Sequence, residues 1–197
     1  LGDGAVGASL TCDPRVNGVA FTGSTLTAKV IKKGMAEHLE PGTPLIAETG
    51  GLNAMIVDST ALPEQAIKSI MQSAFQSAGQ RCSALRCVYV QTDIAVDFIE
   101  TLVGAMQELS LGDPWHINTD LGPVIDTAAQ RAIATYIAQA REENRLLYSH
   151  DTPHAGNFVA PALIQVNSIA DLQKEVFGPV LHIATFDNDE IDNVIEA

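Results

Sequence analysis

Apolar residues along the chain form two patterns, short continuous runs and longer stretches with helical spacing. The short runs predict buried strands at residues 18–22, 44–48, 54–57, 86–90, 158–164 and 180–186. Apolar residues that recur every three or four positions predict helices at residues 24–35, 62–77, 94–109 and 127–144. Strands that alternate with helices are typical of an α/β fold with a largely parallel sheet.

Neither end of the sequence has the pattern of a natural boundary. Residues 1–4 resemble a loop that follows a strand. Residues 189–197 have a helical pattern without a cap or a C-terminal glycine. We therefore expect a fragment of a longer polypeptide.

Composition narrows the classes of partner. The formal net charge is −13, with 11 Lys and Arg against 24 Asp and Glu, so no nucleic-acid partner is expected. The longest apolar runs are too short to span a bilayer, and no transmembrane segment is expected. Three cysteines without a framework spacing suit a reducing cytoplasm, the expected location.

The candidate nucleophile is Cys82, which lies between a helical pattern and a strand pattern. Arg81 precedes it, and a neighbouring positive charge favours the reactive thiolate. Gly79 and Ser83 are small enough to let a substrate carbonyl approach the sulfur. The alternative is a buried structural cysteine, which behaves as a small hydrophobe. A cysteine hydrolase remains open as well, although it needs a histidine base near Cys82.

Two glycine-containing stretches are candidates for binding phosphate. Gly2, Gly4 and Gly7 match the string G-x-G-x-x-G, but no strand precedes them and the expected downstream acidic residue is absent. Gly23 and Ser24 separate a strand pattern from a helical pattern. Serine at this position either caps the helix or, together with free backbone amides, holds a pyrophosphate.

Two further loops carry candidate residues. Glu48 ends a strand pattern and is followed by Thr49 and two glycines, so its carboxylate can reach a cavity without crowding. The alternative is an acid that faces solvent. Residues 175–179 form a loop that ends in a chain-reversing Gly-Pro pair. No metal site is expected from these patterns.

Four stretches occur together in one order: FTGS at 21–24, ETGG at 48–51, GQRCS at 79–83 and EVFGPV at 175–180. This set resembles the aldehyde dehydrogenase superfamily, and the 34 positions between Glu48 and Cys82 fit that family's spacing of base and nucleophile. The phrases AETGGLNAMIVDSTALPEQ and SAGQRCSALR resemble its pyrroline-5-carboxylate dehydrogenase branch, as found in bacterial bifunctional proline utilization proteins.

The resemblance implies NAD-dependent oxidation of L-glutamate γ-semialdehyde, a small-molecule aldehyde, to glutamate. Cys82 would attack the aldehyde and form a thiohemiacetal that is oxidised to a thioester. Glu48 would activate the water that hydrolyses the thioester, and the Cys82 amide would hold the oxyanion. Ser83 would contact the substrate carboxylate.

The resemblance also assigns positions to the NAD cofactor. Ser24 would contact the pyrophosphate, Glu175 would hold a ribose, and Phe177 would pack near the nicotinamide. Gly7 would head a helix on the adenosine side. The other implied cofactor-binding positions are Gly23 and Thr49.

The implied architecture is a fragment of the aldehyde dehydrogenase fold. Residues 1–49 would end the NAD-binding domain, and residues 50–197 would form most of a truncated catalytic domain. The family's oxyanion asparagine and ribose-binding lysine would lie upstream, and its substrate-anchoring loop and oligomerisation strand downstream. We expect the isolated fragment to be inactive and the parent protein to be a homo-oligomer. FAD is expected only if a proline dehydrogenase domain precedes this segment.

Three alternatives to this function stay open. The substrate could be another aldehyde, such as succinic semialdehyde. The chain could be a catalytically silent homologue that acts as a binding module, although both Cys82 and Glu48 are present. A thiol hydrolase would need no nicotinamide cofactor. The choice between NAD and NADP is also open.

Overall fold

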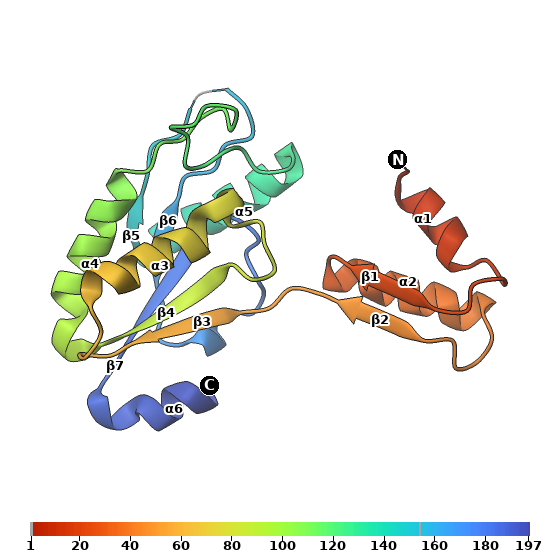
Figure 1. The fold of residues 1–197 in the computed structure, drawn as a ribbon, viewed down its shortest axis with the longest axis horizontal. Coiled ribbons are helices and arrows are strands. Elements are labelled where there is room, and N and C mark those ends of the chain that lie inside the picture. The colour runs from red at the N-terminus through yellow and green to blue at the C-terminus, as the bar shows by residue number, and fades with distance from the viewer. Residues whose placement is uncertain (1, 154) are drawn as a thin grey trace. The chain divides into compact units, whose positions relative to one another are not determined.

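The computed structural model describes residues 2–153 and 155–197. The chain divides into two compact units, Leu1–Gly51 and Leu52–Ala197, two residues beyond the boundary expected from the sequence. Strands alternate with helices in both units, and most strand pairs are parallel (Figure 1). This architecture confirms the α/β class. None of the helices that the structure describes is long and apolar enough to cross a membrane.

The first unit contains two helices and a two-stranded parallel sheet. Its elements are α1 (Gly4–Thr11), β1 (Val19–Thr22), α2 (Thr25–His38) and β2 (Leu45–Glu48). The prediction that Gly7 heads a helix is wrong. Asp3 is the N-cap and accepts the amides of Ala5 and Val6, so α1 begins at Gly4 and Gly7 lies inside it.

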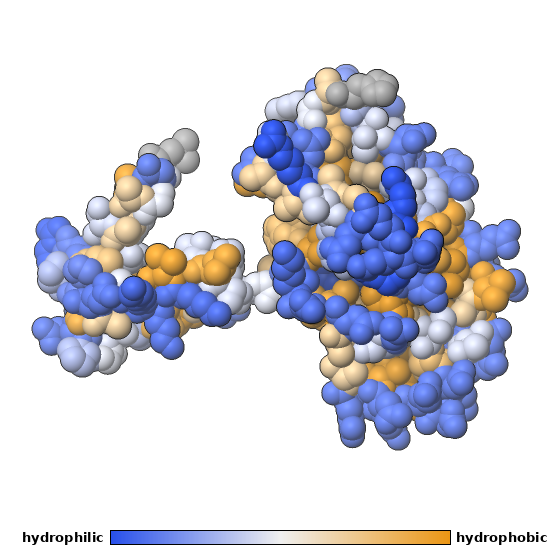
Figure 2. All heavy atoms as spheres, turned by 180° about the vertical axis from the view of Figure 1, so that it is seen from behind, coloured by the Kyte–Doolittle hydropathy of each residue, from blue (hydrophilic) through white to orange (hydrophobic). Residues whose placement is uncertain are grey.

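This first unit buries few apolar side chains. Among its described residues only Ala28 and Met35 are buried hydrophobics. Several large apolar side chains of its helices and strands are exposed, namely Val6, Leu10, Leu26, Val30 and Ile46. Figure 2 shows apolar surface, in orange, beside polar side chains on both units. Because two strands and their helices enclose little volume, the first unit has only a small core of its own.

The second unit is built on a five-stranded sheet of order β3-β4-β7-β6-β5. Its strands are β3 (Asn53–Val57), β4 (Leu85–Gln91), β5 (Leu146–Ser149), β6 (Ala162–Gln165) and β7 (Val180–Phe186). All pairs are parallel except β5 with β6. Every residue of β4 is buried, as expected for a central strand covered on both faces.

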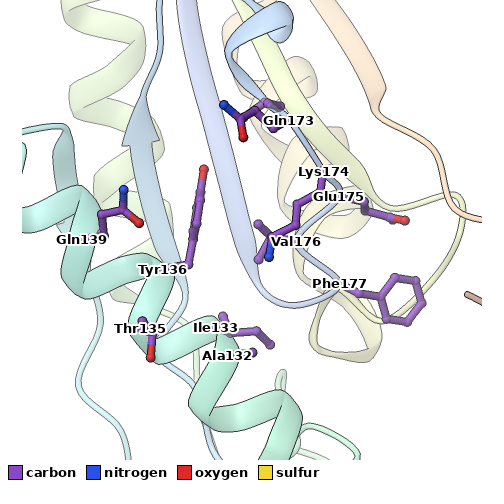
Figure 3. A pocket seen from close by; sticks show the side chains of 11 residues that line it. Ala132, Ile133, Thr135, Tyr136, Gln139, Gln173, Lys174, Glu175, Val176 and Phe177 are labelled. Atoms are coloured by element: carbon purple, nitrogen blue, oxygen red, sulfur yellow. The ribbon is translucent and has the colours of Figure 1, made fainter. Parts of the chain in front are cut away.

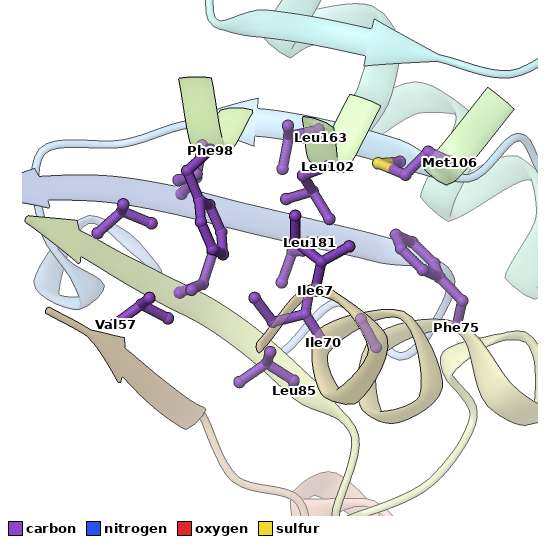
Figure 4. Close-up of a cluster of buried hydrophobic side chains, with 14 of the residues drawn as sticks. Val57, Ile67, Ile70, Phe75, Leu85, Phe98, Leu102, Met106, Leu163 and Leu181 are labelled. Carbon is purple, nitrogen blue, oxygen red and sulfur yellow. The ribbon is translucent and has the colours of Figure 1, made fainter. Parts of the chain in front are cut away.

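Helices cover both faces of this sheet. The helices are α3 (Pro63–Phe75), α4 (Thr92–Gln107), α5 (Thr127–Glu142) and α6 (Ile191–Glu196), with 3₁₀ segments at Gln76–Gly79, Ile169–Asp171 and Asn188–Glu190. Leu163 and Leu181 pack in one core cluster with α3 and α4 (Figure 4). Ala162 and Ile164, the neighbours of Leu163 on β6, pack with α5 in another cluster. The unit therefore has three layers, helix, sheet and helix.

Two details of the sequence-based prediction are wrong. The strand expected at residues 158–164 begins only at Ala162, after Pro161, which has no amide hydrogen for a ladder. Strand β5 was not expected. It follows Asn144, whose φ of 57° reverses the chain at the end of α5.

Candidate active site

Cys82 follows a tightly turned segment at the end of α3. Three consecutive residues, Ser77, Ala78 and Gly79, have left-handed φ angles of 57°, 54° and 65°. Only glycine adopts this conformation without steric cost, so the other two residues are strained. Backbone strain of this kind persists only where the surroundings hold it, and it is typical of functional loops.

A second loop holds the strained segment in place. A Cβ atom added to Gly79 would lie 2.1 Å from the carbonyl oxygen of Gly178. The backbone before Cys82 therefore touches the backbone of the loop at residues 175–179 directly. Glycine at position 79 is required both for the φ angle and for this close approach.

Two side-chain amides, of Asn53 and Gln80, bind backbone groups in and near the Cys82 loop. The amide nitrogen of Asn53 donates to the carbonyl oxygens of Cys82 and Ala84, at 2.8 and 2.9 Å. The amide oxygen of Gln80 accepts the backbone N–H of Ile125 at 2.8 Å. Sequence reasoning missed Asn53, although its place at the start of the strand beside β4 was a usable signal.

The cysteines differ in environment. Cys82 is exposed, which excludes a buried structural role for it. Cys87 is fully buried on β4, and burial raises the pKa of its thiol to about 12, so it stays protonated and unreactive. Arg81 donates from its guanidinium to the side-chain oxygen of Gln76 at 2.9 Å. Its expected effect on the Cys82 thiolate stays a prediction.

A buried arginine joins the Cys82 loop to the loop at residues 175–179. Arg86 is only 1% exposed, and its Nε and Nη2 donate to Oε1 of Glu175 at 3.0 and 2.7 Å. Nη1 donates to the carbonyl oxygen of Gly178, and Nη2 also donates to that of Arg81, both at 3.2 Å. The residue before Cys82 and the expected ribose-binding Glu175 thus share one partner.

Phe177 lies beside this arginine and lines a hollow. Its ring centre is 5.3 Å from the guanidinium carbon of Arg86, a cation–π distance, and the residue is 46% exposed. The hollow, of about 520 Å³, lies between α5 and residues 172–177. Figure 3 shows Tyr136 facing residues 173–176 across it, with the Phe177 ring pointing away from Tyr136.

His182 on the neighbouring strand β7 contacts the same arginine through its backbone carbonyl. Its Nδ1 lies 2.8 Å from the carbonyl oxygen of Arg86, and its Nε2 lies 2.9 Å from the hydroxyl of Tyr136. Because a carbonyl only accepts, Nδ1 carries the proton and Tyr136 donates to Nε2. Burial lowers the pKa of His182 to about 4, so the ring is neutral near pH 7.

In the first unit, the expected residues gather at the carboxyl ends of β1 and β2. Thr22 pairs with Glu48, and the backbone N–H of Gly23 donates to the carbonyl oxygen of Glu48 at 3.1 Å. The Glu48 side chain is exposed, and Thr49 follows it. Ligands of parallel sheets bind at this edge, beyond the carboxyl ends of the strands.

Ser24 caps helix α2, as one of its two interpretations predicted. Its hydroxyl oxygen accepts the backbone N–H of Thr27 at 3.1 Å. The first bond within the helix runs from the N–H of Ala28 to the carbonyl of Ser24, so the amides of Thr25 and Leu26 precede the helical ladder. These two amides are available to an anion.

The expected site residues thus fall into two groups. One group lies in the first unit, at the carboxyl ends of β1 and β2, and consists of Gly23, Ser24, Glu48 and Thr49. Gly7 belongs to neither group, because it lies inside α1. In the second unit, Arg86 joins the loop that carries Cys82 and Ser83 to the loop that carries Glu175 and Phe177. Across the described ranges, no cluster of three or more His, Cys, Asp or Glu side chains is arranged to hold a metal ion.

A model of the aldehyde dehydrogenase family matches residues 1–197. The chain belongs to the aldehyde dehydrogenase family. It is 47% identical to the bifunctional protein PutA of Escherichia coli (strain K12), over 97% of this chain and 15% of that protein. It is 34% identical to betaine aldehyde dehydrogenase 2 of Rhizobium meliloti (strain 1021), over all of this chain and 41% of that protein. The chain therefore spans a small part of the family members it resembles.

Solved aldehyde dehydrogenase family structures have the same fold. Proline utilization A (PutA) of Bradyrhizobium japonicum superposes with a TM-score of 0.94 at 47% identity, over 99% of this chain and 20% of that one. Betaine aldehyde dehydrogenase of Staphylococcus aureus in complex with NAD⁺ superposes with a TM-score of 0.87 at 30% identity, over 96% of this chain and 39% of that one. The expected aldehyde dehydrogenase fold is confirmed.

The contact between Gly79 and Gly178 leads to a stability prediction. Gly79→Ala should lower the free energy of unfolding by about 2 kcal/mol or more, because alanine is strained at positive φ and its Cβ meets a backbone oxygen. Gly104→Ala is the matched control. It lies inside α4 with open space around its Cβ, and should raise stability by up to about 1 kcal/mol. Urea denaturation of the three chains measures both effects, and equal stabilities would contradict the contact.

The neutral His182 leads to a prediction for acid pH. The unfolded chain protonates this ring near pH 6.5, whereas the folded chain does so only near pH 4, so unfolding takes up a proton between those values. Stability should therefore fall with decreasing pH, by about 2 kcal/mol between about pH 7.5 and about pH 5. Urea denaturation of wild type and His182→Gln at both pH values measures the part of this loss that comes from His182. An unchanged pH dependence in the variant would refute it.

Proposed function

We propose that this chain carries the nucleophile of an NAD-dependent dehydrogenase that oxidises L-glutamate γ-semialdehyde to glutamate in proline catabolism. The observation that carries the proposal is the exposed Cys82 on a fixed loop that shares Arg86 with Glu175. The 46–47% identity to the bifunctional PutA proteins of Klebsiella aerogenes and Escherichia coli, and the likeness to solved proline utilization A structures, support a place in proline catabolism. We propose a cytoplasmic location and a homo-oligomeric parent protein on the same ground.

Cys82 performs the covalent step. Its thiolate adds to the aldehyde carbon, a C–S bond forms, and the carbonyl oxygen becomes the oxyanion of a thiohemiacetal. The backbone amide of Cys82 is the proposed donor to this oxyanion. NAD, when bound, supplies the acceptor for the hydride that leaves the same carbon. A thioester to Cys82 then remains.

Glu48 performs the second step. Its carboxylate takes a proton from a water molecule, and the water oxygen attacks the thioester carbon. The C–S bond breaks, the carboxylic acid leaves, and the Cys82 thiolate is restored. Glu48 suits this role because it is exposed at the carboxyl end of β2. Ser83, exposed next to the nucleophile, is the proposed contact for the substrate carboxylate.

The described residues fit a dinucleotide. The free amides that begin α2, beside Ser24 and the side-chain-free Gly23, suit a pyrophosphate. One oxygen of Glu175 is available to a ribose hydroxyl, and the exposed Phe177 ring offers an apolar face to the nicotinamide. Thr49, which follows Glu48, completes the proposed cofactor positions. FAD belongs to the proposal only if a proline dehydrogenase domain accompanies this segment.

Another aldehyde is the second candidate substrate. Identities of 32–34% to hydroxyisobutyraldehyde and betaine aldehyde dehydrogenases favour it, because those relatives are named for other aldehydes. Succinic semialdehyde is one such compound. The chemistry proposed for Cys82 and Glu48 is the same for all of them.

NADH formation by the complete protein that carries this chain tests the proposal. Glutamate semialdehyde should be oxidised faster than other aldehydes. Cys82→Ala should lower kcat by about a thousandfold or more, because it removes the nucleophile of the covalent step. Glu48→Gln should block turnover after a first burst of NADH, because only the hydrolysis step needs the base. Cys12→Ala, at a half-buried cysteine outside the proposed site, is the matched control.

Two outcomes of this assay would count against the proposal. Turnover of other aldehydes alone would remove glutamate semialdehyde as the substrate. Full activity of the Cys82→Ala variant would remove the nucleophile. A separate assay of the isolated 197-residue chain tests our proposal that this segment is inactive by itself, which measurable turnover would contradict.

Thiol labelling distinguishes the enzyme from a silent homologue. In the folded protein, iodoacetamide should modify the exposed Cys82 at least about a hundredfold faster than the buried Cys87, whose pKa is raised to about 12. NAD should change the rate at Cys82, since the proposed cofactor lies next to the nucleophile. Mass spectrometry of digested samples measures both rates. If the rate of Cys82 alkylation is the same with and without NAD, the result would support a silent homologue or a thiol hydrolase.

A further inference from the structure

The two carboxylate oxygens of Glu175 have different surroundings. Arg86 donates to Oε1 twice, from Nε at 3.0 Å and from Nη2 at 2.7 Å. Among the described residues, none donates a hydrogen bond to Oε2. Arginine often pairs its two donors with the two oxygens of a carboxylate. Here both donors converge on one oxygen, and the other is left for a different donor.

The guanidinium cannot easily move away from this arrangement. Arg86 is 1% exposed, and its other hydrogen bonds go to the carbonyls of Gly178 and Arg81. Its own carbonyl accepts a hydrogen bond from His182, and its strand lies between β3 and β7. Breaking such a buried pair leaves an uncompensated charge, which is strongly unfavourable.

We infer that Arg86 is a positioning residue that holds Glu175 by Oε1 and so presents Oε2 to a ribose hydroxyl of the nicotinamide cofactor. The inference rests on the cofactor role proposed above for Glu175. Arg86 itself touches neither cofactor nor substrate. Through the carbonyl of Arg81, the same guanidinium also sets the distance between the cofactor loop and the backbone before Cys82.

Lysine cannot replace arginine in this role. Its ammonium is a point charge on a flexible stem, and it lacks the planar fork that serves Glu175, Gly178 and Arg81 together. Arg86→Lys therefore keeps the positive charge and loses the orientation of the carboxylate. Glu175→Gln keeps the side-chain shape and loses the charged acceptor.

A double-mutant cycle in the complete protein tests the inference. NAD is titrated against wild type, Arg86→Lys, Glu175→Gln and the double variant, with binding followed by fluorescence. Each single variant should bind NAD about tenfold more weakly, and the double variant should bind no more weakly than Glu175→Gln alone, because Arg86 acts through Glu175. The value of kcat for Arg86→Lys, measured at saturating NAD, should lie closer to the wild-type value than its KM for NAD does.

Exposed residues of α5 supply the matched controls. Arg141→Lys and Glu142→Gln change the same groups at positions that face solvent, and NAD affinity should stay at the wild-type value. Additive losses from Arg86→Lys and Glu175→Gln would overturn the inference and leave the cofactor role of Glu175 intact. Unchanged affinity in Glu175→Gln would overturn that role, and the inference with it.

A crystal structure of the complete wild-type protein with NAD covers the case in which Arg86→Lys does not fold. We expect a ribose hydroxyl on Oε2 of Glu175, with both Arg86 donors still on Oε1. A ribose hydroxyl on Oε1, with Arg86 displaced, would refute the inference.

Discussion

A guanidinium group removed from water must find acceptors for its N–H groups, and Arg86 finds them on segments far apart in sequence. One is the carboxylate of Glu175, 89 positions away, and the others are backbone carbonyls of two loops. Satisfying this buried charge fixes where both loops run. Gly79, in the left-handed turn before Cys82, approaches the backbone of Gly178 and so brings the same two loops together.

The sequence predicts the regular elements well because their signals are local. Continuous apolar runs mark β4 and β7, which are covered on both faces, and helical spacing marks α3, α4 and α5. Errors occur where a single residue decides the geometry. Asp3 caps a helix that the apolar pattern does not predict. Asn144 reverses the chain after α5, so that it continues as β5 at the edge of the sheet.

The candidate site is only partly predictable for the same reason. Cys82, Glu48 and Ser24 stand out locally, because each lies where a strand or helix meets a glycine-rich turn. Asn53 and Arg86 do not, since their partners are 29 and 89 positions away and no local pattern identifies them. A residue that acts by orienting others becomes visible only once the fold brings its partners together.

Cys82 and Cys87 show why position in the fold, rather than residue type, decides reactivity. They lie five positions apart, and the intervening chain passes from an exposed turn into the central layer of the sheet. Burial raises the pKa of Cys87 to about 12, so its thiol is both inaccessible and protonated. Arg86, next to Cys87, is buried as well, but it directs its charge back toward the turn. Strand β4 thus makes Cys87 unreactive by burying it, and its Arg86 supports the loop on which Cys82 is exposed.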